Sequence, residues 1–410
     1  MVPAPPKPRA VRTCRTAASA GAFKQVQELP DWQRAALTLQ HLPPSLLELE
    51  YCWENLWESA PATLDLTHLT ALTKLTTGHQ VPIFSDAKLP CSLRHLVCGR
   101  LQDIQPLLPL RYLRRSEIQS GRSTSEQLAR LSSLTGLTQI SLGYYDIDSF
   151  NADYYVGVDE RQLTPSASAA AWPALASKLR ELHINCPYCL GSPPDGEVDG
   201  LSAAAVAALG SLSALTSFKL MGVDCLDTPP AQLAATLRRC TALQHLQLGQ
   251  LKLDWLPDGR ADDNDGDQTV EQRLDQAKAA GMEAVAAAIA RLPNLKSIRL
   301  LALPLSVRAA ATLAAAAAGT QLTRLQLVHC GVTATGLSAV ALRLSNLRDL
   351  EVHVDGDVDA AIPVLGRLPL QRLKLGHGWN SCKLESFEVF LPNWRSLMRS
   401  YLPGGRRSLA

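Results

Sequence analysis

The most constraining feature of this chain is a spacing of leucines that recurs along most of its length. One complete unit lies between Leu322 and Leu347. It contains the pattern L-x-x-L-x-L, two further apolar positions and an Ala- and Leu-rich stretch, supplied by Leu322, Leu325, Leu327, Cys330, Val332 and residues 336–344. In a short β-strand, alternate side chains point to opposite sides, so Leu325 and Leu327 point to the same side. One unit cannot bury that apolar edge alone, so copies must stack on both sides of it.

The same frame can be placed on twelve leucines. Counted as position 1, they are Leu46, Leu72, Leu93, Leu110, Leu137, Leu179, Leu215, Leu243, Leu295, Leu322, Leu347 and Leu370. Most steps between them lie near the roughly 20 to 29 residues usual for such a repeat. Three longer steps contain segments that we interpret as insertions, near 144–173, 187–200 and 254–275.

Two of the frames are weak. Thr77 and Arg115 occupy the inward-facing sixth position of the frames at Leu72 and Leu110. Polar residues in that position weaken the match to the pattern, because the position faces the core.

The pattern resembles the leucine-rich-repeat superfamily, and its second half resembles the ribonuclease-inhibitor-like and cysteine-containing classes, with Cys330 at position 9 and a helix after it. The resemblance implies an α/β fold: a curved, horseshoe-shaped solenoid with parallel strands on the concave face and helices or irregular segments on the convex face. It also implies a protein-binding sheet and no catalytic chemistry. Ala- and Leu-rich composition predicts helices over 201–209, 232–239, 282–292, 307–318 and 337–344. Prolines ahead of the N-terminal strands favour short irregular segments there.

The sequence predicts four regions: a disordered basic tail over 1–27, a cap over 28–45, the solenoid over 46–380, and a C-terminal cap and tail over 381–410. The first region has five basic residues and no acidic one, so it is either a plain tail or a transit peptide. No secretory segment or apolar run of the ~20 residues needed to span a membrane is present. With ten cysteines explained as core residues, we expect a soluble, monomeric, intracellular protein, cytoplasmic or, with a transit peptide, organellar.

Two short motifs point to other chemistry but lack its context. Cys186-Pro187-Tyr188-Cys189 matches a thiol-oxidoreductase active site, but Gly and Pro follow it where that chemistry needs a helix N-terminus. Asp262 to Asp267 resembles a calcium loop, but Ala261 and Gln272 occupy two ligand positions. We therefore expect no enzyme activity, no metal and no cofactor, and keep a thiol oxidoreductase as an alternative.

Charge is distributed unevenly between the strands and the rest of the chain. Positions 2, 3 and 5 of the frames point away from the core and hold twelve Lys or Arg against five Asp or Glu, a balance of +7, whereas the whole chain carries +2. Because neighbouring strands stack these side chains, their potentials add and attract an acidic partner. Solubility alone is the alternative reason for such residues.

From these positions we predict a binding surface for an acidic or phosphorylated polypeptide, and no nucleic acid or membrane. Its candidate residues are Arg94, His95, Arg111, Arg114, Arg180, His183, Lys219, His245, Lys296, Arg299, Arg324, Arg348, Arg372 and Lys374. The predicted function is a scaffold or adaptor. An F-box substrate receptor of a ubiquitin ligase is the alternative, indicated only by Leu29-Pro30 and residues 37–47. The acidic insertion over 254–275 suggests a further hypothesis, that it competes with the ligand for the basic surface.

Overall fold

The structure is a computed structural model of the whole chain. It describes residues 13–16, 39, 42–51, 64–77, 82–83, 86–101, 104–121, 130–143, 171–185, 203–222, 230–249, 270–317, 321–355, 365, 368–377 and 387–390. The chain divides into two compact units, Met1–Pro187 and Tyr188–Ala410.

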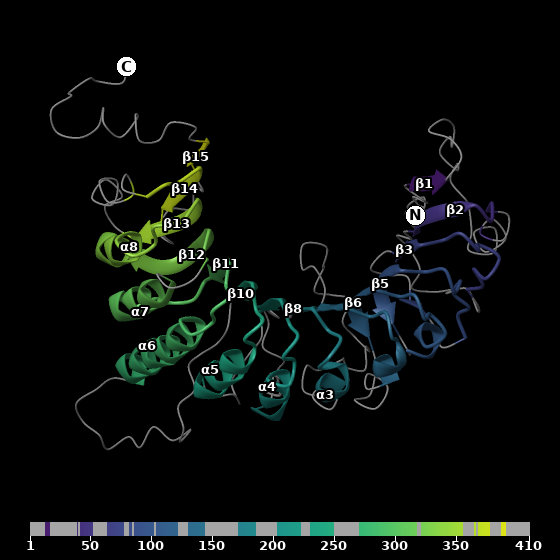
Figure 1. Cartoon of the computed structure of the whole chain (residues 1–410), viewed down its shortest axis with the longest axis horizontal. Helices are drawn as coiled ribbons and strands as arrows, with labels where there is room; N and C mark the ends of the chain where they lie inside the picture. The colour runs from purple at the N-terminus through teal and green to yellow at the C-terminus, as the bar shows by residue number, and fades with distance from the viewer. Residues whose placement is uncertain are drawn as a thin grey trace, which may run out of the picture. The chain divides into compact units, whose positions relative to one another are not determined.

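The first unit is a sheet whose strands follow one another in sequence order (Figure 1). Its parallel strands are β2 (Leu46–Tyr51), β3 (Lys74–Thr77), β5 (His95–Leu101), β6 (Arg115–Gly121), β7 (Gln139–Gly143) and β8 (Glu181–Asn185). β1 (Thr13–Thr16) pairs antiparallel with β2, and β4 (Pro82–Ile83) pairs with β5. The return segments include two 3-10 helices, η1 (Gln105–Leu107) and η2 (Leu131–Ser133), and the short helix α3 (Ala171–Leu175).

The second unit alternates strands with longer helices (Figure 1). Its parallel strands are β9 (Ser217–Met221), β10 (His245–Gly249), β11 (Ser297–Leu301), β12 (Arg324–Thr333), β13 (Asp349–Asp355) and β14 (Arg372–His377), and β15 (Phe387–Phe390) pairs antiparallel with β14. Its helices are α4 (Ala203–Leu209), α5 (Pro230–Arg239), α6 (Val270–Ile289), α7 (Val307–Ala317) and α8 (Ala334–Ala341).

The register of the strands matches the leucine frame. In the second unit, the residues at position 3 are direct partners from strand to strand: Ser217, His245, Ser297, Arg324, Asp349 and Arg372. Leu322 and Leu325, at positions 1 and 4, are 1% and 0% exposed. The described strands therefore stack as the sequence predicts, and each unit has the leucine-rich-repeat fold, with a core of inward-facing leucines.

The frame at Leu110 is wrong by three residues. His95, at position 3 of its frame, pairs with Arg115, and Arg115 pairs with Gln139. Position 1 of this repeat is therefore Leu113, and Ser116, which is 0% exposed, occupies the core at position 4. Sequence reasoning chose Leu110 because it seeks an apolar residue at position 4, and this repeat has a serine there.

The return segments agree with the sequence in kind. α4, α5 and α7 lie close to the predicted ranges, α8 begins three residues earlier than predicted, and the first unit has the expected short segments. α6 begins at Val270 rather than at 282, so it includes the last residues of the predicted insertion over 254–275. The rest of that insertion, most of 144–173 and all of 187–200 lie outside the described residues.

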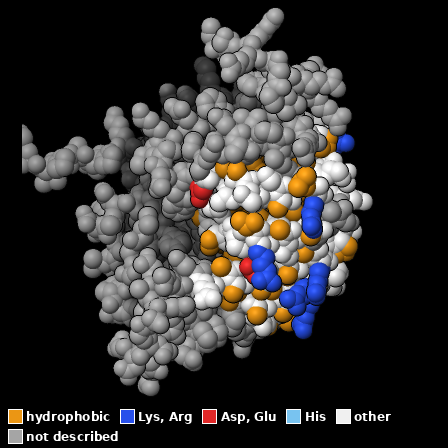
Figure 2. All heavy atoms as spheres, turned by 90° about the vertical axis from the view of Figure 1, so that its left-hand side faces the viewer, with side chains coloured by type: hydrophobic (Ala, Val, Ile, Leu, Met, Phe, Trp, Pro, Cys, Tyr) orange, Lys and Arg blue, Asp and Glu red, His pale blue; other side chains and the backbone are white. Residues whose placement is uncertain are grey.

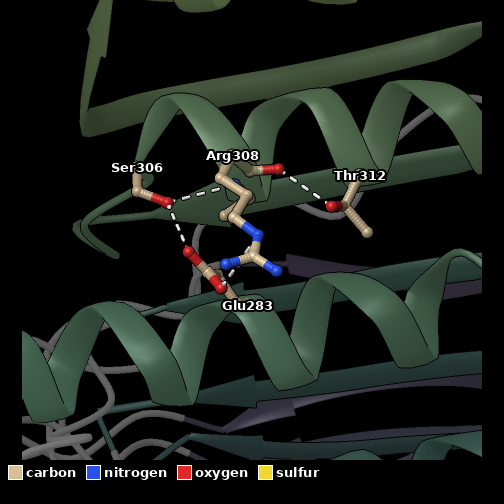
Figure 3. Close-up of polar contacts among 5 residues, drawn as sticks. Glu283, Ser306, Arg308 and Thr312 are labelled. Carbon is tan, nitrogen blue, oxygen red and sulfur yellow. Dashed lines mark hydrogen bonds and ion pairs between the residues drawn. The ribbon is translucent and has the colours of Figure 1, made fainter.

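The helices of the second unit pack through a polar contact as well as an apolar one (Figure 3). Ser306 caps α7 by accepting a hydrogen bond from the backbone N–H of Ala309 at 3.0 Å, and its hydroxyl donates to Glu283 of α6 at 3.4 Å. Arg308 Nε lies 3.5 Å from the same carboxylate. An N-cap serine satisfies a helix donor that would otherwise be unpaired, so this contact fixes where α7 begins against α6.

The ends of the sheet differ from the sequence prediction in one respect. Thr13–Thr16 form β1, so the disorder predicted for residues 1–27 does not hold for these four residues. β15 lies within 381–410, the segment predicted to be a C-terminal cap. No helix among the described residues is long and apolar enough to cross a membrane.

Candidate functional site

The strand face is the surface formed by positions 2, 3 and 5 of the repeat. Inward and outward side chains alternate along each strand, so Phe218 and Leu220 of β9 are buried while Ser217 and Lys219 between and beside them are partly exposed. The parallel register then aligns equivalent positions into rows that cross the strands about 4.8 Å apart. The leucine spacing thus fixes which polar residues share a row.

Four adjacent strands of the second unit carry no acidic residue at these positions. On β9 to β12 the outward residues are Thr216, Ser217, Lys219, Gln244, His245, Gln247, Lys296, Ser297, Arg299, Thr323, Arg324 and Gln326. We call its charged and titratable members the basic strip: Lys219, His245, Lys296, Arg299 and Arg324. The sequence predicted all five as site residues, and the register brings them onto one face.

Arg299 lies in the middle of the basic strip. It pairs in register with Gln247 of β10 and Gln326 of β12. The Nε atom of Arg299 is buried and has no hydrogen-bond partner among the described residues. A buried, charged donor without an acceptor is unfavourable, so Arg299 is the member of the strip that gains most from an anionic ligand.

The neighbours of Arg299 are oriented by bonds to other groups. Gln326 donates to Glu351 of β13, and Gln247 Nε2 lies 3.4 Å from the sulfur of Met221. Lys296 donates from Nζ to Gln244 at 3.0 Å. Each of these three side chains therefore has a partner other than Arg299.

On β13 and β14 the predicted basic residues are largely neutralised. Asp349 lies 3.2 Å from Arg324 and 4.0 Å from Arg372, and Glu351 lies 2.8 Å from Lys374. Partial burial raises the pKa of Glu351, but the hydrogen bond and charge of Lys374, with smaller effects of Gln326 and Arg299, lower it overall. Arg372 and Lys374 therefore pair with these carboxylates, as Arg324 does with Asp349, so the net positive charge is lower at this end of the strand face. Arg348, at position 2 of β13, is exposed and forms no ion pair with a described residue.

In the first unit the predicted residues form a separate group. Arg94, which directly precedes β5, and His95 of β5 lie beside Arg114, which precedes β6, and all three are exposed. His183 belongs to β8 and Arg180 directly precedes it, on the other side of β7 from this group. Arg111 does not reach the strand face, because the corrected frame places it in the turn before β6.

Sequence reasoning missed two strand-face residues of the first unit. With position 1 at Leu113, Arg115 occupies position 3 and Glu117 position 5, and their side chains lie 3.4 Å apart. Only the strand pairing reveals this, since the sequence placed Arg115 in the core.

Three of the described thiols, Cys98, Cys240 and Cys330, lie in the core, whereas Cys91 is exposed. Cys330 is 0% exposed and donates from Sγ to the carbonyl oxygen of Leu300 in the preceding repeat at 3.4 Å. Burial raises the pKa of Cys98 and Cys330 to about 12 and that of Cys240 to about 11. Position 9 is therefore a packing position in this repeat. The Cys186–Cys189 motif and the acidic run 262–267 lie outside the described residues.

No group of three or more His, Cys, Asp or Glu residues in the described part of the chain is arranged to hold a metal ion. The opposite side of the second unit is also different in character from the strand face. Figure 2 shows the side on which α6, α7 and α8 lie, with a few Lys and Arg side chains among larger areas of apolar and uncharged atoms.

Neither a protein-family model nor a curated protein sequence matches the chain. Among solved structures, the chain is similar to an internalin from Listeria monocytogenes strain 4b F2365, at 14% identity over 83% of this chain and 86% of that one, with a TM-score of 0.38. It is also similar to TLR13 in a complex with ssRNA13, at 16% identity over 83% of this chain and 45% of that one, with a TM-score of 0.43. The chain thus spans less than half the length of TLR13. The fold assignment rests on the strand register and the buried leucines.

Proposed function

We propose that this protein is a non-enzymatic recognition module, a scaffold or adaptor, in which the basic strip binds an acidic segment of a protein partner. The observation that carries the proposal is the absence of any carboxylate at the outward positions of β9 to β12, where Lys219 of β9 stands two strands from Arg299 of β11 and from Lys296, which directly precedes β11. Their potentials add over a short distance, and within the described part of the second unit the nearest carboxylates on the strand face are Asp349 and Glu351 of β13.

The basic strip ends at β13, where the outward positions hold the carboxylates Asp349 and Glu351. Asp349 and Glu351 stand beside Arg324 and Gln326 and pair with Arg372 and Lys374, so an acidic ligand gains less there than over β9 to β11. This difference in charge limits the site on the side of β13 and favours one placement of the ligand over others. We expect the ligand's carboxylates to be centred on Arg299, whose guanidinium can take a carboxylate through two parallel hydrogen bonds.

The F-box alternative depends on residues between β1 and β2. Leu46–Tyr51 form β2, so an F-box would have to end before Leu46, and most of residues 28–45 lie outside the described residues. Co-purification of a Skp-type adaptor with the full chain supports that alternative. Turnover of a disulfide substrate that is lost in Cys186→Ser supports the thiol-oxidoreductase alternative.

Binding of a fluorescein-labelled Glu-rich peptide, followed by fluorescence anisotropy, tests the proposal. We expect Arg299→Gln to weaken binding roughly three- to tenfold, because it removes a charge-assisted hydrogen bond at the centre of the strip. The matched control is Arg343→Gln, which removes an exposed arginine just after α8 and so changes the net charge equally. Binding should weaken as salt rises from about 0.05 M to about 0.5 M.

Two results would overturn the proposal. One is equal affinity of the wild-type, Arg299→Gln and Arg343→Gln proteins, which would mean that the peptide responds to net charge alone. The other is a single-stranded RNA that displaces the peptide and binds more tightly than it does, with the same dependence on Arg299.

A further inference from the structure

We propose a second binding site, on the strand face of the first unit, that takes a phosphate group carried by a side chain of a protein partner. Five residues of β3, β5 and β6 and of the turns before β5 and β6 form it, and we call them the His95 cluster: Lys74, Arg94, His95, Arg114 and Arg115. The site lies in a different unit from the basic strip, and it does not depend on the proposed function of that strip.

The strand register brings these residues together. Lys74 of β3, His95 of β5 and Arg115 of β6 are direct partners at position 3. Arg94 and Arg114 occupy position 2 of the repeats that contain β5 and β6. The backbone N–H of Arg114 donates to the carbonyl oxygen of Arg94 at 2.8 Å. Their side chains therefore leave the backbone about one strand spacing apart, on the same face as His95.

The cluster is only half neutralised within the described residues. Lys74 lies 3.6 Å from Glu48 of β2, and Arg115 lies 3.4 Å from Glu117 of its own strand. Arg94 and Arg114 are both exposed and form no ion pair with a described residue. Two arginines whose side chains leave adjacent repeats on the same face are a ready site for an anion that can bridge them.

The pKa of His95 is affected by the same excess of positive charge. Although His95 is exposed, the protein atoms around its ring displace part of its hydration and lower its pKa, and the charges of Arg115, Lys74, Arg114 and Arg94 lower it further. Those four groups come from β3, β6 and the turns before β5 and β6, and the one acidic group on β6, Glu117, is paired with Arg115. An anion bound between the arginines would favour the charged imidazole, so binding must raise the pKa of His95. By linkage, a ligand of fixed charge must bind more tightly as pH falls through that pKa.

The chemistry favours a phosphate group over a carboxylate. A phosphomonoester carries about −1.5 to −2 charges at pH 7 and three acceptor oxygens, enough to bridge two guanidinium groups and an imidazole. A carboxylate carries one charge and pairs best with one arginine. The surrounding residues favour a polypeptide over a nucleic acid, since Glu48 and Glu50 on β2 and Glu181 on β8 interrupt the basic surface on both sides. A nucleic-acid backbone needs a continuous basic track.

The first test compares a phosphoserine peptide with the same peptide carrying serine or glutamate in that position, by anisotropy on the full chain. We expect the phosphorylated peptide to bind at least severalfold more tightly than either, and the double variant Arg94→Gln/Arg114→Gln to lose that preference. The matched control is Arg348→Gln, an exposed position-2 arginine of the second unit, which should keep it. Unchanged circular dichroism and unfolding midpoint in the double variant exclude misfolding.

The second test separates the titration of the protein from that of the ligand. Inorganic sulfate stays doubly charged at mild pH, so it serves as the probe, with chloride of equal ionic strength as reference. The resonance of His95, assigned by its loss in His95→Gln, should show a higher pKa in sulfate than in chloride, and no such difference in Arg94→Gln/Arg114→Gln. Sulfate affinity should rise severalfold between about pH 8 and about pH 5.5 in the wild type but not in His95→Gln.

Three outcomes overturn the inference: equal binding of the three peptides, a His95 pKa that is the same in sulfate and chloride, or a single-stranded RNA that binds the cluster more tightly than the phosphopeptide. The basic strip is tested separately, with the Glu-rich peptide and Arg299→Gln. A negative result for one of the two sites therefore does not affect the interpretation of the result for the other.

Discussion

In the repeat that contains β6, a single residue, Ser116, makes the leucine pattern difficult to recognise in the sequence. It fills the core at position 4, is 0% exposed, and its hydroxyl has no hydrogen-bond partner among the described residues. Every other frame has Leu, Ile or Phe at that position. Because of this serine, the register of β6 and the position of Arg115 on the strand face could not be predicted from the sequence.

Ser116→Ala should stabilise the protein. The substitution removes a buried hydroxyl without a partner and leaves the rest of the backbone unchanged, so we expect the free energy of unfolding to rise by about 1 kcal/mol. Urea denaturation followed by circular dichroism measures this. A loss of stability would show that the hydroxyl is paired in solution.

The cysteines should divide by burial. Cys98, Cys240 and Cys330 are buried with raised pKa values, so in the folded protein they are both inaccessible and protonated at pH 8. Cys91 is exposed. Brief iodoacetamide treatment followed by mass spectrometry should label Cys91 and leave the other three unmodified until denaturant is added. Labelling of Cys330 as fast as Cys91 in the native state would contradict the assignment of position 9 to the core.

At the scale of elements, each strand is held by the leucines that it shares with the strands beside it. Leu325 of β12 pairs in register with Ile298 of β11 and Leu350 of β13, and all three are buried. Leu325→Ala should therefore cost roughly 2 to 5 kcal/mol, because it opens a cavity between repeats. Leu342→Ala, at a side chain that is 67% exposed, is the control and should change stability little. An unchanged denaturation midpoint in Leu325→Ala would contradict the frame on which the fold assignment rests.

The buried histidine of β13, His353, should make the stability of the second unit fall at acid pH. His353 is 4% exposed, its ring centroid lies 4.3 Å from that of His329, and its Nδ1 has no hydrogen-bond partner among the described residues. Burial lowers the pKa of His353, and the charge of His329 lowers it further, against a smaller raising effect of Glu351. The unfolded chain then binds a proton more readily, so stability is lost as pH falls below about 6.5, the ordinary pKa of histidine.

The measurement is the loss of stability between about pH 7.5 and about pH 5.5, from urea denaturation. We expect a smaller loss in His353→Gln than in the wild type. His245→Gln, on the exposed strand face, should behave as the wild type does. Equal losses in all three proteins would show that His353 titrates in the folded state as it does in the unfolded chain.

For the whole molecule, the sequence predicted packing more fully than function. Repeating leucines imposed the strand order and register of each unit, because burial of a shared apolar edge allows only one alignment. Positions where the pattern is broken, such as Ser116, or where pairing is antiparallel, as for Thr13–Thr16, could not be read from the spacing. The site was predicted as a row of basic residues, but their neutralisation by Asp349 and Glu351 depends on which strands are neighbours and on side-chain geometry.

The net charge of the whole chain does not reflect how charge is distributed over the strand face. The chain carries +2 in total, whereas twelve outward positions of β9 to β12 hold Lys219, Lys296, Arg299 and Arg324 and no carboxylate. Net charge alone gives no reason to expect an acidic partner. The parallel register gathers the cations on one face, and this arrangement makes the prediction local and testable.

Chemical footprinting with the Glu-rich peptide locates the ligand on the protein without a mutation. Arginine and lysine side chains are modified in the free and peptide-bound protein, and the rates are compared by mass spectrometry. We predict protection of Lys296 and Arg299 on the strand face, and unchanged rates at Arg308 and Arg343 on the helical side. Protection of Arg308 and Arg343 with no change at Lys296 and Arg299 would contradict it.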